Sequence, residues 1–176
     1  MNPGRVKSKP PLSRAPLALA AALCLISLFP PYAAFAGAAE DGPVVIRSTH
    51  GDFDNVWQSL IMALTDRGLV VSGVSHVGRM LERTGKALGR TKKIFARAKV
   101  LEFCSAVVSR DMMEQNPHFI AFCPYQIAVY TLPGDEKTVY LSYRRLIWKD
   151  KSGKAALQEV EKLLDGIVND AIRQSY

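Results

Sequence analysis

The sequence predicts an α+β fold, a two-layer sandwich in which helices lie on one face of a mostly antiparallel sheet. Residues 44–176 contain two kinds of segment: some in which apolar residues recur at helical spacing, and short β-branched runs that favour strands. Their order is strand, helix, strand, helix, strand, helix, strand, strand, helix, which is not a regular β-α-β alternation. The last two strands flank a Pro-Gly-Asp-Glu turn at residues 133–136, which is typical of an antiparallel hairpin.

The first part of this region predicts a strand, a helix and a second strand. Residues 44–47 form a β-branched run, and Asp52 is a suitable N-cap for the helix that follows. That helix has one apolar stripe, made by Phe53, Val56, Trp57, Leu60, Ile61 and Leu64. Gly68 provides its stop, and residues 69–77 have the composition of a strand interrupted at Gly73.

The middle of the chain is less regular. Met80, Leu81 and Leu88 indicate a short helix, and Ile94 and Phe95 indicate a further turn. Residues 100–108 predict a strand, after which Ser109 would cap a short helix that runs through Glu114 and ends before Pro117.

The last part of the chain predicts the hairpin and a closing helix. Residues 119–123 and 125–132 are apolar and predicted to be extended around Pro124, and residues 138–143 alternate like a half-buried strand. Apolar residues keep helical spacing from Leu157 to Ile172, so this helix should pack across the sheet.

The N-terminal segment has the pattern of a secretory signal peptide. Basic residues precede a 13-residue apolar run at 17–29, which reaches only about 20 Å as a helix, short of the roughly 30 Å hydrocarbon core. Small residues at positions 34 and 36 predict cleavage between Ala36 and Gly37. We therefore expect a signal peptide at 1–36, a short linker at 37–43, a single domain at 44–176 and a periplasmic or secreted product.

The positive charge of the chain does not indicate a nucleic-acid partner. The net charge is +7, but Arg5, Lys7, Lys9 and Arg14 lie ahead of the apolar run. Without them 19 basic residues stand against 16 acidic ones, which is too small an excess to favour a polyanion. The expected export also argues against a nucleic-acid partner.

One segment, residues 79–99, concentrates the basic side chains and contains a single acid, Glu82. Either it is a solvated face, or it makes weak peripheral contact with anionic lipid or with an acidic partner. The residues that would make this contact are Arg79, Arg83, Lys86, Arg90, Lys92 and Lys93.

Two cysteines remain after signal cleavage, Cys104 and Cys123. In an oxidising compartment they form a structural disulfide, stay as two unpaired thiols, or work as a redox or metal-binding pair. No C-x-x-C motif favours redox chemistry. We expect no cofactor, although zinc or copper held by both thiols with His76 as a third ligand is a further hypothesis.

No motif of a catalytic serine, a carboxylate pair or a phosphate loop occurs, so the sequence favours a protein without enzymatic activity. The hairpin region is rich in tyrosine, which covers a core edge more often than it binds a ligand. A candidate ligand groove there would include His76, Tyr125, Tyr130, Tyr143 and Arg144.

Short stretches of the chain resemble a known bacterial family. They are ALTDRGLV at 63–70, SHVGRML at 75–81 followed by RTG at 83–85, EFCS at 102–105, FCPYQIAVY at 122–130 and YLSYR at 140–144. Together they are similar to the domain of unknown function 302, over about residues 44–172.

The resemblance implies a TATA-binding-protein-like two-layer domain, commonly homodimeric, with no established activity. Typical members have Pro-Cys ahead of the fourth strand, whereas this chain has Cys123-Pro124, so we carry over no role for the cysteine. The leading hypothesis is an exported domain that binds a small ligand or a partner protein, with thiol or metal dependence as the alternative. Membrane-surface contact through residues 79–99 is the third hypothesis.

Overall fold

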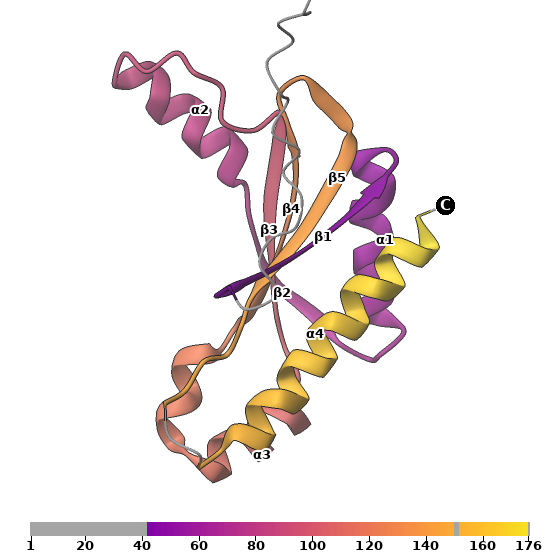
Figure 1. Cartoon of the computed structure of the whole chain (residues 1–176), viewed down its shortest axis with the longest axis vertical. Helices are drawn as coiled ribbons and strands as arrows, with labels where there is room; N and C mark the ends of the chain where they lie inside the picture. The colour runs from indigo at the N-terminus through magenta and orange to yellow at the C-terminus, as the bar shows by residue number, and fades with distance from the viewer. Residues whose placement is uncertain (1–41, 150–151, 176) are drawn as a thin grey trace, which may run out of the picture. The chain divides into compact units, whose positions relative to one another are not determined.

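The computed structural model describes residues 42–149 and 152–175 of the chain. Within them five strands form one sheet in the order β1-β5-β4-β3-β2, with every neighbouring pair antiparallel. The predicted α+β fold, with an antiparallel sheet and helices on one face, is confirmed (Figure 1). The predicted signal peptide at 1–36, the Ala36–Gly37 cleavage site and linker residues 37–41 lie outside the described residues.

The hairpin occupies the middle of the sheet. It consists of β4 (Tyr125–Leu132) and β5 (Asp135–Arg144), in which Tyr130 pairs with Tyr140. β1 (Val44–His50) adds to the outer side of β5, and β3 (Arg97–Cys104) adds to β4. β2 (Val70–Ser75) lies at the edge, and its register with β3 shifts between Val71 and Gly73, where the sequence indicated an interruption.

Two long helices cover one face of this sheet. α1 (Phe53–Thr65) begins at Asp52, whose carboxylate accepts hydrogen bonds from the backbone N–H groups of Asp54 and Asn55, as predicted for an N-cap. α4 (Lys154–Gln174) packs beside α1 (Figure 1). The fully buried side chains between the two layers include Val56, Leu60, Leu64, Leu101, Ile127, Val129, Leu141, Leu164, Ile167 and Val168.

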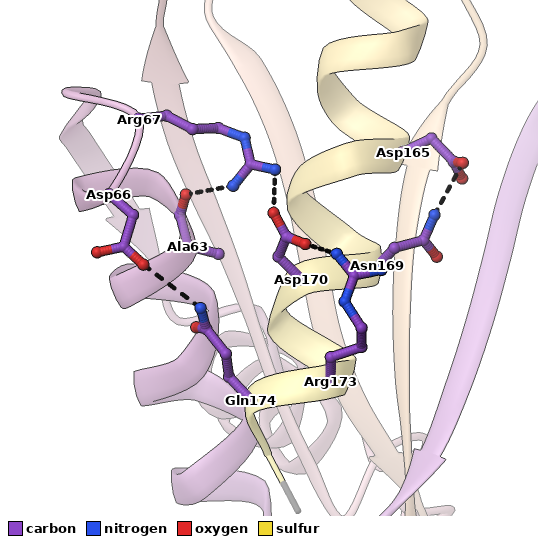
Figure 2. A network of polar contacts seen from close by, with 8 residues as sticks. All are labelled: Ala63, Asp66, Arg67, Asp165, Asn169, Asp170, Arg173 and Gln174. Atoms are coloured by element: carbon purple, nitrogen blue, oxygen red, sulfur yellow. Dashed lines mark hydrogen bonds and ion pairs between the residues drawn. The ribbon is translucent and has the colours of Figure 1, made fainter.

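Polar contacts join the ends of the two long helices (Figure 2). Arg67, in the turn after α1, donates to the Ala63 carbonyl at 2.8 Å and forms an ion pair with Asp170 of α4. Asp170 also pairs with Arg173, and Gln174 donates to Asp66 at 3.3 Å. The Arg67–Asp170 and Gln174–Asp66 contacts thus connect the end of α4 to the turn after α1 at the rim of the core.

α2 (Val77–Ala87) differs from the other helices because none of its side chains is buried. It contacts β3 and extends away from the sheet (Figure 1). In the part of the chain that the structure describes, no helix is long and apolar enough to cross a bilayer.

The boundary between β3 and α3 differs from the prediction. The strand ends at Cys104 rather than continuing to residue 108, and α3 (Ala106–Gln115) starts directly after it. Ser105, not Ser109, caps this helix and accepts a hydrogen bond from the Val108 N–H at 3.4 Å. The cap outweighs the β preference of Val107 and Val108 because it satisfies an otherwise free helix N–H.

The segment before β4 is also not extended as predicted. Residues 117–122 form the 3-10 helix η1 (Pro117–Phe122), which Asn116 caps by accepting from the His118 N–H at 3.0 Å. Pro117 favours this start because its fixed φ suits the first helical position and its missing N–H needs no partner. Phe119 is buried as a result, and the Cys123–Pro124 peptide after η1 is cis.

Candidate functional site

The structure brings together two cysteines that come from separate elements. Cys104 is the last residue of β3, and Cys123 lies between η1 and β4. They meet because β3 and β4 are neighbours, with Phe103 in register with Tyr125. Both are free thiols; Cys104 is exposed and Cys123 is half-buried.

Cys123 affects the ionisation of Cys104. The pKa of Cys104 is raised, first by partial desolvation and then by the neighbouring Cys123, through its charge and a side-chain hydrogen bond. A backbone hydrogen bond from Tyr125 acts in the opposite direction. Because desolvation and a neighbouring ionisable group both disfavour the charged form, Cys104 holds its proton more tightly than a lone cysteine.

A short polar chain extends from Cys123 into the core. The Cys123 thiol donates to Ser109 Oγ at 3.5 Å, and Ser109 Oγ lies 3.1 Å from Tyr125 Oη. Burial raises the pKa of Tyr125 to about 12, against the lowering effect of the Ser109 hydrogen bond. Ser109 was expected to cap a helix; instead it is inside α3, facing the core.

His76 does not join the thiol pair. It precedes α2 at the far end of β2, while Cys104 is opposite Val70 at the near end of that strand. Across residues 42–149 and 152–175, no group of three or more His, Cys, Asp or Glu side chains is arranged to hold a metal ion. The zinc or copper site with His76 as third ligand is therefore not assembled here.

The candidate tyrosine groove is also divided. Tyr125 and Tyr143 are buried on the helix-covered face, where Tyr143 Oη donates to Asp165 at 3.2 Å. Tyr130 is half-buried on the opposite face, stacked on Tyr140 with ring centroids 5.2 Å apart. Strand alternation predicts this division, because positions 125 and 130 differ by an odd number.

Arg144 and Tyr125 do line one cavity, of ≈ 70 Å³. Arg144 donates to Gln126 at 3.3 Å, and Gln126 donates to Glu102 at 3.0 Å. The cavity is well below the several hundred cubic ångströms of ordinary small-molecule sites. It has room for a few waters rather than for an organic ligand.

The residues of the predicted anionic-surface contact do come together. Arg79, Arg83 and Lys86 lie on α2, and Arg90, Lys92 and Lys93 lie on the segment that leads back to β3. All six are exposed.

Comparisons with known proteins agree with the fold. Residues 44–171 match the model of the family described as "Domain of unknown function DUF302". A solved structure, an uncharacterized conserved DUF302 protein from Bacillus stearothermophilus, is similar with a TM-score of 0.61 and 17% identity, over 73% of this chain and 98% of that one. No curated protein sequence matches the chain.

Proposed function

Because this chain belongs to the DUF302 family, whose description names no activity, we propose its function from its own side chains: an exported, non-enzymatic protein that works through the thiol pair Cys104 and Cys123. The pair forms a reversible intramolecular disulfide by exchange with a disulfide of a partner. The N-terminal signal pattern supports export, and an exported protein meets oxidising conditions in which such exchange takes place.

One observation carries this proposal: strand register places two thiols from separate parts of the chain close enough for Cys123 to affect the ionisation of Cys104, and Cys104 faces solvent. Buried cysteines that only fill space have no route to a partner. Here Cys104 is exposed at the end of β3, whereas Cys123 is half-buried behind it and hydrogen-bonded to Ser109. This difference suits an attacking thiol at the surface and a resolving thiol beneath it.

The exchange balances in two steps. The Cys104 thiolate attacks one sulfur of the partner disulfide, forming a mixed disulfide and releasing one partner thiol. The Cys123 thiolate then attacks the Cys104 sulfur, forming the Cys104–Cys123 bond and releasing the second partner thiol. The two protons lost by the cysteines end on the two partner thiols, and two electrons pass from this protein to the partner.

The raised pKa of Cys104 sets the pH dependence of the first step. The thiolate is the nucleophile, and a raised pKa lowers its fraction at neutral pH. The rate of mixed-disulfide formation should therefore still be rising above about pH 8.5, the value near which an ordinary cysteine is half ionised.

The test is to equilibrate the protein with oxidised and reduced glutathione, quench with a thiol-alkylating reagent under denaturing conditions, and measure the intact mass. For the mature protein that begins at Gly37 and has lost Cys24, we expect two alkylations in the reduced buffer and none in the oxidised one. The Cys123→Ser variant should accumulate glutathione on Cys104, whereas Cys104→Ser should react more slowly because Cys123 is less accessible.

Two alkylations that persist in the oxidised buffer would overturn the proposal. A disulfide that glutathione never reduces would instead identify a permanent structural bridge. Metal analysis of the same sample distinguishes disulfide exchange from metal binding by the thiol pair, because stoichiometric zinc or copper would indicate metal binding.

We also propose that the protein is a homodimer, as the family resemblance implies. Sedimentation velocity tests it, with twice the chain mass as the expected result. A monomer at micromolar concentration would contradict it.

A further inference from the structure

The segment 77–95, which we call the basic arm, consists of α2 and the chain that returns from it to β3. It is attached at one end, where Gly78 lies so close to β3 that an added Cβ would be 2.9 Å from the Ala98 nitrogen. Beyond this contact none of the α2 side chains is buried. The arm therefore contributes little to the core.

The arm has a polar side and an apolar side. Arg79, Glu82, Arg83 and Lys86 follow one another at short helical spacings, which places them on one side of α2. The remaining side includes apolar side chains that are only partly covered: Met80 is 42% exposed, and Leu88, directly after the helix, is 67% exposed. In the returning chain Ile94 is 50% exposed.

A cavity of ≈ 290 Å³ lies between α2 and the returning chain. Leu81, Ile94 and Phe95 supply its apolar lining. Its charged lining consists of one carboxylate, Glu82, and four basic groups, those of Lys86, Arg90, Lys92 and Lys93. Apolar and cationic groups around one concavity match a molecule with an acyl part and an anionic head.

The charge of the arm is unbalanced. The arm has six cationic side chains and a single carboxylate, that of Glu82, which is paired with Lys86 at 3.1 Å. The other five form no ion pair with a carboxylate of the described residues. A second copy of the chain would present the same positive arm, so an occupant of opposite charge is favoured.

We propose that the basic arm docks on the surface of an anionic phospholipid membrane. Leu88, Met80 and Ile94 enter the boundary between headgroups and acyl chains, and the lysines and arginines contact the lipid phosphates. This is the interfacial mode of a basic amphipathic helix, which lies on a bilayer and does not cross it. The inference is independent of the thiol pair.

The test is co-sedimentation of the protein with vesicles of phosphatidylglycerol and phosphatidylcholine, or of phosphatidylcholine alone, at low salt. We expect binding to the anionic vesicles only, and release by added salt. Lys92→Glu with Lys93→Glu should weaken this binding by at least about tenfold. The matched control, Lys137→Glu with Lys154→Glu, reverses two exposed charges outside the arm and should bind like the wild type.

A second pair of variants tests the apolar contact. Leu88→Ser with Ile94→Ser should reduce binding, whereas Val107→Ser with Ile120→Ser, which removes similarly exposed apolar groups elsewhere, should not. All variants are purified from the same exporting host as the mature protein that begins at Gly37, so the apolar run at 17–29 does not contribute to vesicle binding.

Failure to bind anionic vesicles at low salt would overturn the proposal. Arm variants that bind as well as the controls would also overturn it. If inorganic phosphate abolishes binding at constant ionic strength, the arm binds free phosphate rather than a membrane, and the proposal is overturned as well. If the protein self-associates in the absence of vesicles and the arm variants abolish this self-association, the arm contacts a second copy of the chain instead.

Discussion

Two threonine hydroxyls lie in the core without a hydrogen-bond partner among the described residues. They belong to Thr49 of β1 and Thr131 of β4, and both are in register with Val139 of β5 between them. A buried hydroxyl that has lost water and gained no protein partner lowers the free energy of unfolding. These side chains thus identify a place where the core is not optimised for stability.

Thr131→Val should raise the free energy of unfolding by about 1 kcal/mol, because it keeps the side-chain shape and removes the unpaired hydroxyl. Chemical denaturation measures the difference. Thr91→Val, at an exposed position of the arm, is the control and should change it by less than about 0.5 kcal/mol. A destabilised Thr131→Val variant would contradict the prediction and indicate a bound water at this position.

The raised pKa of Tyr125 makes stability depend on high pH. The folded state holds this pKa at about 12, mainly through burial, whereas an unfolded tyrosine ionises near its ordinary value of about 10. The neutral phenol is therefore favoured by folding. Its contribution is fully present below about pH 10 and is lost as the pH rises towards 12.

Tyr125→Phe removes this ionisation, so its free energy of unfolding should fall less between about pH 9 and pH 11 than that of the wild type. Denaturation at the two pH values gives the slope. An unchanged slope would show that other groups, such as Tyr143, whose pKa burial also raises, control the alkaline limit.

At the scale of the elements, capping residues decide boundaries that propensity leaves open. The β-branched pair Val107 and Val108 favoured a longer third strand, and Ser109 was the predicted cap of the next helix. The buried Ser105 takes that role instead, so the helix starts at residue 106 and Ser109 turns towards Tyr125. Two serines in neighbouring turns offer the same local signal, and only packing against β4 distinguishes them.

The attachment of α2 to the sheet depends on one glycine. Gly78→Ala would place a methyl group 2.9 Å from the Ala98 nitrogen and 3.2 Å from its oxygen, both backbone atoms that cannot turn away. We expect α2 to shift from β3, with a stability loss of about 1–3 kcal/mol and faster amide hydrogen exchange in α2.

Gly166→Ala in α4 is the matched control. An added Cβ there has no neighbour closer than 3.5 Å, so the same substitution should instead stabilise the protein by roughly 0.5–1 kcal/mol. Equal effects at the two glycines would rule out the close contact at Gly78 as the cause.

At the scale of the whole molecule, the thiol pair joins the end of β3 to the segment just before β4. A Cys104–Cys123 disulfide would close a loop of about 20 residues and should raise the free energy of unfolding by roughly 3 kcal/mol through the lost entropy of the unfolded chain. The comparison is between oxidised and reduced protein in chemical denaturation.

A Cys104→Ser, Cys123→Ser double variant controls for the reductant and should give the same midpoint with and without it. Oxidised protein that is less stable than reduced protein would indicate that the bond strains the native structure. The exchange proposal would then favour the dithiol as the resting form.

The sequence by itself determined the fold class, the order of the elements, the hairpin and the stripe of α1, because these depend on periodicities within a few residues. It also identified the two cysteines and the basic segment as candidates. It did not determine that Tyr125 and Tyr130 face opposite sides, although their odd spacing contained that information. Only the tertiary structure placed Cys104 beside Cys123 and left His76 at the other end of β2, since strand register joins positions that local patterns treat as independent.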